Sequence, residues 1–329
     1  ATYGAGAATI NVAYENPAKG KRTATIGWYN THAFEKRAQA DGFVAHSLFG
    51  DAFSHRMKEE TIEKIRETVG SVDLVVYSLA SGVRVDPDTG ERYTSVLKPI
   101  GRPYEAKSID AKEREVRDVR VEPATEEEVE RTIKVMGGED WQLWIERLLE
   151  AGVLEEGART VAYSYIGPDL TKPLYREGTI GRAKEHLEGT ARELAQRLQP
   201  IGGNAFVSIN KAIVTRASSV IPVVSLYLAV LYRVMKEKNL HESAIEQMYR
   251  LLRDKLYRPD APPLDEEGRI RVDDYEMRDD VQGEVSELWN KIDRDNVEEL
   301  ADVDGMQRDF LHIHGFGFDD VDYDEDVEP

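Results

Sequence analysis

The first 79 residues alternate between strand-like and helix-like segments, and this alternation restricts the fold more than any other feature of the sequence. Strand-like segments cover residues 8–15, 42–48 and 72–79, separated by helix-like segments at roughly residues 27–40 and 56–69. The third strand-like segment, VDLVVYSL, is almost unbroken in its apolar character, as in strands covered on both faces. Strands and helices that alternate through short turns are typical of a doubly wound parallel sheet. We therefore predict an α/β fold of Rossmann type, extended and short-chain-dehydrogenase-like, with added substrate-binding helices.

The composition permits one large domain and excludes several kinds of partner. With 329 residues, of which 41% are hydrophobic, the chain can bury a sizeable core. A net charge of −19 argues against binding to nucleic acid or to an anionic membrane surface. The absence of cysteine excludes disulfides and thiolate chemistry. No segment is long and apolar enough for a bilayer span, so we expect a cytoplasmic protein that binds no membrane.

The remainder of the chain adds strands to this sheet and helices around it. We expect a single domain over residues 1–329, with buried strands at residues 161–166 and 205–210. Within it, residues 82–157 form an excursion with a hairpin and helices near the substrate site. Residues 220–318 form a helical region on the substrate side, beginning with the strongly apolar helix at residues 220–236. Residues 319–329 form an acidic tail.

Ligands of open α/β sheets bind at the carboxyl ends of the strands. Here these ends carry Glu15, Asp51 with Ala52, and Leu79 with Ala80. An acid that ends the second strand of a dinucleotide fold accepts hydrogen bonds from the ribose and repels a 2′-phosphate, so Glu15 favours NAD over NADP. An ordinary carboxylate at a strand end is the alternative interpretation of Glu15.

The glycine-rich phosphate turn of a dinucleotide fold is missing from its expected place. Gly4 and Gly6 precede the strand that ends at Glu15, whereas the turn should follow the strand before it. Residues 3–7 are typical of a connection from a first helix into a second strand. We expect the first strand and its glycine turn to lie upstream of Ala1.

The segment from Val161 to Leu187 carries the strongest candidate for catalysis. Tyr165 ends a strand, Tyr175 lies in the following loop, and Lys184 lies in a helix that begins near Thr179. A phenol beside an ammonium group can stabilise a carbonyl oxygen that gains negative charge. Tyr175 and Lys184 are nine positions apart, on opposite faces of a continuous helix, so Tyr175 must lie before the helix if they act together. A buried tyrosine and a solvated lysine are the alternative.

Long blocks of the sequence resemble one family of enzymes. DLVVYSLASGVRVDPDTGERYTSVLKPIGRPY, VEPATEEEVERTIKVMGGEDWQLWIERL, AYSYIGPDLTKPLYREGTIGRAKEHL and VTRASSVIP are similar to the FabV/TER class of trans-2-enoyl-ACP and trans-2-enoyl-CoA reductases. The likeness runs from GWYN near the start to HGFGFDDVDYDEDV near the end. It implies reduction of the C2=C3 double bond of trans-2-enoyl thioesters by NADH, the last step of fatty-acid elongation.

The resemblance also implies roles for individual residues. Tyr175 and Lys184 match the family's catalytic Tyr-x8-Lys pattern, and Tyr165 matches a second tyrosine at the substrate thioester. Lys184 is expected to lower the pKa of Tyr175. The residues expected at the cofactor are Tyr14, Glu15, Asp51, Ala52, Leu79, Ala80, Lys184, Val214 and Thr215. Arg216 stands where the family's pattern has glutamine.

The expected cofactor is NADH/NAD+, without flavin or metal, in a monomer. His312 and His314 are two residues apart and no H-E-x-x-H occurs, so the histidines do not predict a metal site. The acyl carrier, acyl carrier protein or coenzyme A, stays open. Two other functions also stay open: a short-chain-type ketone or alcohol oxidoreductase, and a regulatory protein that binds NAD without catalysis.

Overall fold

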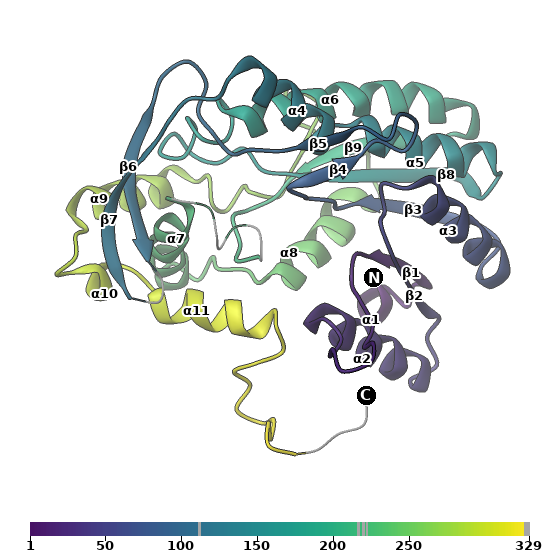
Figure 1. Ribbon diagram of the computed structural model, residues 1–329, viewed down its shortest axis with the longest axis horizontal. Helices are drawn as coiled ribbons and strands as arrows, with labels where there is room; N and C mark the ends of the chain where they lie inside the picture. The colour runs from purple at the N-terminus through teal and green to yellow at the C-terminus, as the bar shows by residue number, and fades with distance from the viewer. Residues whose placement is uncertain (111–112, 216–217, 219–220, 222, 326–329) are drawn as a thin grey trace.

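A four-stranded parallel sheet forms the centre of the molecule (Figure 1). The computed structural model describes residues 1–110, 113–215, 218, 221 and 223–325. In spatial order the strands are β10 (Ile270–Arg271), β9 (Asn204–Ile209), β8 (Leu154–Ser164) and β3 (Val72–Tyr77). The predicted parallel, Rossmann-type sheet is therefore confirmed, but the strands predicted at residues 8–15 and 42–48 pair with each other and not with residues 72–79. β8 begins seven residues before the predicted strand at residues 161–166, because its first half continues beside the start of β3 despite a polar sequence.

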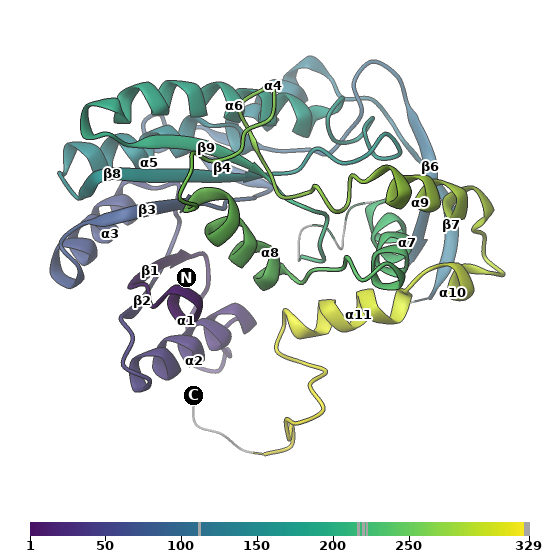
Figure 2. The same ribbon diagram turned by 180° about the vertical axis from the view of Figure 1, so that it is seen from behind.

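Alternate residues of the central strands enter two different hydrophobic cores. Val161 and Phe206 pack on one face with Leu251 and Leu256 of a π-helical turn. The neighbouring residues of these strands, such as Ala162, pack on the other face. The helices at that face are α3 (His55–Thr68), α5 (Glu139–Glu150) and α6 (Thr179–Leu198). The opposite face is covered by α8 (Ala244–Arg250) and the π-helical turn η3 (Leu251–Leu256) (Figure 2). Burial on both faces explains the apolar character of β9 and of the second half of β8. The prediction that residues 72–79 are covered on both faces is wrong, because β3 lies at the edge of the sheet with Asp73 and Val76 exposed.

A second parallel pair of strands lies in a small lobe beneath β3 (Figures 1 and 2). It consists of β1 (Thr9–Ala13) and β2 (Ala45–Phe49), with α1 (Thr2–Ala5) and α2 (Ile26–Ala40). The short α1 ends at Gly6, which has a φ of 65°, a conformation that glycine adopts without steric cost. Ile10 and Val12 pack against the core that contains α3 and α5, so the lobe is joined to the central sheet by apolar contact.

Two antiparallel hairpins and one helix occupy the segment between β3 and α5. The hairpins are β4 (Val83–Val85) with β5 (Arg92–Thr94), and β6 (Tyr104–Asp110) with β7 (Glu115–Val121). The helix is α4 (Glu126–Met136). It begins with a capping box in which Thr125 and Glu128 satisfy each other's backbone N–H groups. The last hairpin stands at one end of the molecule (Figure 1).

The apolar helix predicted at residues 220–236 is α7 (Val224–Glu237). It is a core helix that packs against β6 and two later helices. The remaining helical segments are η1 (Gln199–Ile201), α9 (Asp279–Lys291), α10 (Val297–Leu300) and α11 (Val303–His312). Among the described residues, no helix combines the length and the apolar character that a membrane crossing needs.

Candidate active site

The sequence-predicted site residues follow the carboxyl ends of parallel strands. Tyr14 and Glu15 follow β1, and Asp51 with Ala52 follows β2. In the central sheet, Leu79 and Ala80 follow β3, Tyr165 follows β8, and Val214 with Thr215 follows β9. Each sheet therefore presents its candidate residues at one edge, as a doubly wound fold requires for a ligand site.

Tyr165 and Tyr175 are brought together by the turns that follow β8. Their ring centroids lie 5.0 Å apart, with the rings almost perpendicular at 88°, a favourable edge-to-face contact. Burial, and next the charge of Glu276, raises the pKa of the Tyr175 hydroxyl above its ordinary value. A neutral phenol is therefore the form present near neutral pH, and it keeps a proton that it can donate.

The start of α6 is fixed next to the two tyrosines. The backbone N–H of Thr179 donates to the carbonyl of Lys98 at 3.0 Å, and its hydroxyl donates to the carbonyl of Val96 at 2.5 Å. At Gly181, a Cβ atom would lie 2.0 Å from the carbonyl oxygen of Arg176. Only glycine permits this close approach, which places the helix directly against the loop that carries Tyr175.

Lys184 lies one turn further along α6. Its Nζ donates to the backbone carbonyl of Tyr163 at 3.3 Å, rather than to the Tyr175 hydroxyl. Burial lowers the pKa of Lys184 to about 8, against the opposing charge of Glu188. The expectation that Lys184 lowers the pKa of Tyr175 is not met in this arrangement. Burial has the largest effect on the pKa of Tyr175, and it raises that pKa. An ammonium has three N–H donors, and those not used on Tyr163 are suited to the hydroxyls or phosphates of a dinucleotide.

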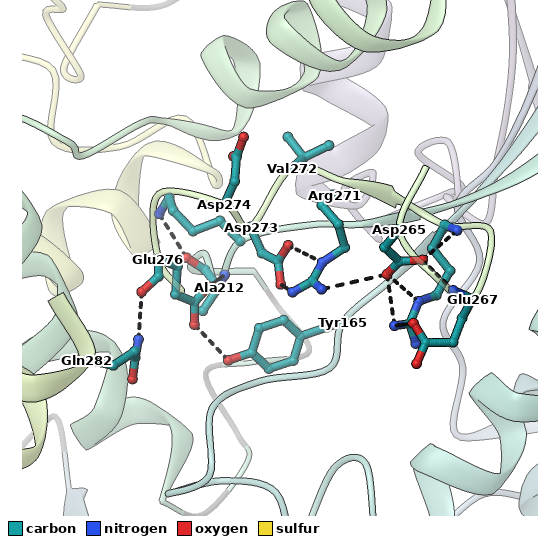
Figure 3. A network of polar contacts seen from close by, with 12 residues as sticks. Tyr165, Ala212, Asp265, Glu267, Arg271, Val272, Asp273, Asp274, Glu276 and Gln282 are labelled. Carbon is teal, nitrogen blue, oxygen red and sulfur yellow. Dashed lines mark hydrogen bonds and ion pairs between the residues drawn. The ribbon is translucent and has the colours of Figure 1, made fainter. Parts of the chain in front are cut away.

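A buried carboxylate on the other side of Tyr165 was not predicted from the sequence. Glu276 lies in the turn between β10 and α9 and is fully buried. Its Oε1 accepts from the hydroxyls of Tyr165 at 3.0 Å and Tyr227 at 2.6 Å, as Figure 3 shows for Tyr165. The backbone N–H of Ala212 donates to Oε2 at 2.6 Å. No local pattern reveals this residue, because its partners come from three distant segments.

A second buried polar cluster supports the Asp51–Ala52 turn. The carbonyl of Ala52 accepts from Lys58 Nζ at 3.1 Å and from Trp144 Nε1 at 3.0 Å. Lys58 in turn forms a buried ion pair with Asp140, with 2.7 Å between Nζ and Oδ1. One signal was present in the sequence: Lys58 shares the apolar helical face of Ile62 and Ile65.

The remaining candidates differ in how firmly they are held. Tyr14 is 77% exposed, which leaves its ring accessible. Val214 is buried, and its N–H donates to the Tyr232 hydroxyl at 3.3 Å. Thr215 exchanges hydrogen bonds with Ser218. Arg216 lies outside the described residues. Among the described residues, no group of three or more histidines, aspartates or glutamates could hold a metal ion.

Most of the chain matches one family model. Residues 22–257 match the model described as the trans-2-enoyl-CoA reductase catalytic region. The chain belongs to this enoyl reductase family. One relative, named enoyl-[acyl-carrier-protein] reductase [NADH], from Coxiella burnetii (strain Dugway 5J108-111), is 55% identical over 330 residues, covering 100% of this chain and 81% of the relative. Another, named trans-2-enoyl-CoA reductase [NADH], from Ruminiclostridium cellulolyticum, is 52% identical, covering 100% of this chain and 83% of the relative.

A solved enoyl reductase has nearly the same fold. The crystal structure of Treponema denticola trans-2-enoyl-CoA reductase in complex with NAD has a TM-score of 0.95 and 49% identity. The alignment covers 99% of this chain and 82% of that one. The resemblance drawn from the sequence blocks is therefore confirmed for the family and for the fold.

Residues 264–327 of this enoyl reductase match a model described as an enoyl reductase FAD binding domain. A flavin dinucleotide has an anionic pyrophosphate, which helix N-termini and backbone N–H groups bind. Here the first turns of α9 and α11 carry acids instead. The arginines in the described part of this segment that form ion pairs with neighbouring carboxylates are Arg269, Arg271, Arg278 and Arg294. These paired arginines and acidic helix starts do not fit the pyrophosphate, and Arg308 on α11 is an exposed single cation.

Proposed function

We propose that this protein reduces the C2=C3 double bond of trans-2-enoyl thioesters with NADH, giving the saturated acyl thioester. The observation that carries the proposal is the edge-to-face pair of Tyr165 and Tyr175, with Lys184 on the adjoining helix. It stands at the carboxyl edge of the sheet in a chain of the enoyl reductase family. The names of the relatives quoted above support the substrate and NADH, and they include both acyl carriers.

NADH, when bound, supplies the hydride that C3 of the substrate accepts. As electrons move toward the thioester oxygen, the Tyr175 hydroxyl donates a hydrogen bond or its proton to that oxygen. A proton that comes in the end from solvent then adds at C2, which completes the saturated acyl thioester. The raised pKa of Tyr175 keeps this proton in place until charge develops on the substrate. Tyr165 fixes the position of the thioester beside it. Lys184 adds a positive charge to the same edge, where it binds the dinucleotide.

The substrate side of the site is formed by the parts of the chain that surround α7. Leu97 and Val119, from the excursion at residues 82–157, pack against the same core as Tyr165 and Tyr175. The helical region at residues 220–318 supplies most of this core, chiefly through α7. We assign these two regions to the acyl chain because their shared apolar surface adjoins the tyrosines.

NADH oxidation tests the proposal directly. Loss of NADH absorbance should accompany addition of crotonyl-CoA or of the same acyl group on acyl carrier protein, and NADPH should be a poor substitute. Comparison of the turnover rates with the two carriers at equal concentration shows which acyl carrier the protein prefers. Turnover of ketones without turnover of enoyl thioesters would instead favour a short-chain-type ketone reductase. NADH binding without any turnover would favour a regulatory protein.

Replacement of the catalytic phenol gives the sharper test. Tyr175→Phe should lower kcat by about 10²–10⁴-fold, the usual contribution of a positioned proton donor, while the fold stays intact. Tyr163→Phe is the matched control, because Tyr163 lies in β8 itself and packs against the core that contains Leu251 and Leu256, whereas Tyr175 belongs to the core around α7. A Tyr175→Phe protein with the turnover of the wild type would contradict the assignment.

We also propose that the reaction uses no flavin, since the acids at residues 279, 280 and 304 leave the C-terminal segment poorly suited to a pyrophosphate. A colourless protein that gains no activity when FAD is added would agree with this. The cytoplasmic location and the monomeric state stay predictions, and light scattering of the purified protein tests the latter.

A further inference from the structure

Glu276 joins three segments of the site through one carboxyl group. Its oxygens accept hydrogen bonds from Tyr165, which follows β8, from Tyr227 in α7, and from the backbone of Ala212, which follows β9. Gln282 holds the backbone of the same residue: its Nε2 donates to the main-chain carbonyl of Glu276 at 2.8 Å (Figure 3). The same Nε2 also donates to the Tyr227 hydroxyl at 3.2 Å. A buried carboxylate is costly unless donors satisfy it, and here three donors do so.

The three partners of Glu276 belong to segments with different roles in the proposed reaction. Tyr165 is the tyrosine assigned to the thioester. Ala212 lies two residues before Val214 and three before Thr215, the residues assigned to the cofactor. Tyr227 belongs to the helix assigned to the acyl chain. One carboxyl group therefore fixes the substrate tyrosine relative to the segment that leads to the cofactor loop.

The direction of the Tyr165 hydrogen bond has a chemical consequence. A phenol has one proton, and an ionised carboxylate only accepts. While Glu276 is ionised, the proton of Tyr165 is directed to Oε1 at 3.0 Å, and only the lone pairs of that hydroxyl face a ligand. The Tyr175 hydroxyl then remains as the donor of the pair. Protonation of Glu276 removes this constraint and lets Tyr165 donate elsewhere.

We propose that Glu276 is a positioning residue for the reduction: it directs the Tyr165 hydroxyl away from proton donation, leaves donation to Tyr175, and holds the Ala212 backbone that leads into the cofactor loop. This inference rests on the proposed function.

The charged and titratable groups that face Glu276 set the pH at which this arrangement is lost. They are Tyr165, Tyr175, Tyr227, Lys211 and Asp273. Burial raises the pKa of Glu276 above its ordinary value, and the hydrogen bonds from Tyr227 and Ala212 and the charge of Lys211 oppose this rise. Lys211 is itself buried, and its Nζ donates to the Ala212 carbonyl at 2.9 Å. The carboxylate is therefore ionised above its raised pKa and protonates as the pH falls through it.

The test compares Glu276→Gln and Tyr227→Phe with the wild type in the crotonyl-CoA assay across pH. The wild-type kcat should fall on the acid side, as Glu276 protonates. In Glu276→Gln this acid limb should disappear, because an amide does not titrate, and kcat at pH 7 should fall about tenfold with little change in the KM for NADH. In Tyr227→Phe the acid limb should move up by about one pH unit, because the carboxylate loses one donor.

A second measurement does not depend on turnover. Amide hydrogen exchange of residues 211–215 should be faster in Glu276→Ala than in the wild type, because the Ala212 N–H loses its acceptor. Exchange in β6 should be unchanged, which controls for general unfolding.

The possible failures are distinguishable. If the wild type oxidises NADH and the Glu276→Gln substitution changes neither the pH profile nor kcat, this inference alone is overturned. If Glu276→Gln does not fold, an unshifted acid limb in Tyr227→Phe overturns it instead. A wild type without enoyl reductase activity overturns the proposed function and the inference that rests on it, whatever the exchange experiment shows.

Discussion

The Nζ of Lys58 lies 2.7 Å from Oδ1 of Asp140, and neither side chain is accessible to solvent. The same ammonium donates to the carbonyls of Ala52 and Phe53 at 3.1 and 3.0 Å, and the Tyr77 hydroxyl donates to the other carboxylate oxygen of Asp140 at 3.2 Å. The pair thus connects the turn after β2 with the end of β3. Both strand ends carry residues that the family resemblance assigns to the cofactor.

Removal of one member of this pair should affect both stability and cofactor binding. Lys58→Met leaves Asp140 buried without its counter-charge, so the free energy of unfolding should fall by about 3–5 kcal/mol. The affinity for NADH should fall as well, because the Ala52 carbonyl loses a donor that holds it. Urea denaturation and quenching of intrinsic fluorescence by NADH measure the two effects.

Another lysine of the same helix provides the control. Lys64 forms an exposed ion pair with Glu67 at 2.9 Å, and Lys64→Met should change the free energy of unfolding by less than about 1 kcal/mol. Equal effects of the two substitutions would contradict the structural role given to Lys58.

The approach of α6 to the Tyr175 loop predicts opposite effects for two glycines of one helix. In Gly181→Ala the new Cβ would meet the Arg176 carbonyl oxygen at 2.0 Å, so the backbone must move and the Tyr175 loop with it. We expect a loss of stability of about 1–3 kcal/mol together with a lower kcat. Gly189→Ala has no heavy atom closer than 3.8 Å, and it should stabilise the helix by up to about 1 kcal/mol. Thermal denaturation and the crotonyl-CoA assay measure both variants.

The sequence predicted those parts of the fold that local patterns encode. The apolar residues of β9 and of the second half of β8 follow from burial on both faces of the sheet, and the helical spacing of Ile62 and Ile65 places α3. The equally apolar β3 lies at the edge of the sheet, where Val76 is 42% exposed. The first half of β8 was missed, because its residues 154–157 are mostly exposed and polar and form a strand only through pairing with a neighbour. Short elements such as β10 also depend on their partners and not on their own sequence.

The candidate site likewise contains residues that the sequence revealed and one that only the structure revealed. Tyr165, Tyr175 and Lys184 lie within 20 residues of one another, so a sequence block could bring them to attention. Glu276 is more than 100 residues from Tyr165 along the chain, and nothing in its own segment distinguishes it from an ordinary surface acid. Only the tertiary arrangement reveals that this carboxyl group is buried among hydroxyls.

Glu15 should determine which nicotinamide cofactor is used. It follows β1 at the carboxyl edge, where an acid repels the 2′-phosphate of NADPH. In Glu15→Ala the ratio of kcat/KM for NADH to that for NADPH should fall by about ten- to a hundredfold, equivalent to about 1.4–2.7 kcal/mol. Steady-state kinetics with the two cofactors measure this ratio. An unchanged ratio would remove Glu15 from the ribose site.

The lowered pKa of Lys184 predicts opposite pH trends for activity and for stability. Its pKa is lowered to about 8 by burial, so the ammonium loses its proton as the pH rises through that value, and kcat/KM should fall with it. The unfolded lysine keeps its proton up to about pH 10.4. Between these two values the unfolded state binds more protons, and the free energy of unfolding should rise with pH. Burial lowers the pKa of Lys211 to about 8 as well, so the stability trend contains both residues.

The pH dependence of kcat/KM distinguishes the titration of Lys184 from that of Lys211. Lys184→Arg keeps a positive charge at every pH in the range, because a guanidinium does not titrate there, so the alkaline limb of kcat/KM should move above pH 9 even if the rate at pH 7 is reduced. Lys211 is unchanged in this variant and cannot produce the shift. Measurement of kcat/KM for crotonyl-CoA from pH 6 to 10, with the free energy of unfolding followed over the same range, checks both trends. An alkaline limb that stays near pH 8 in Lys184→Arg would show that a different group controls the reaction.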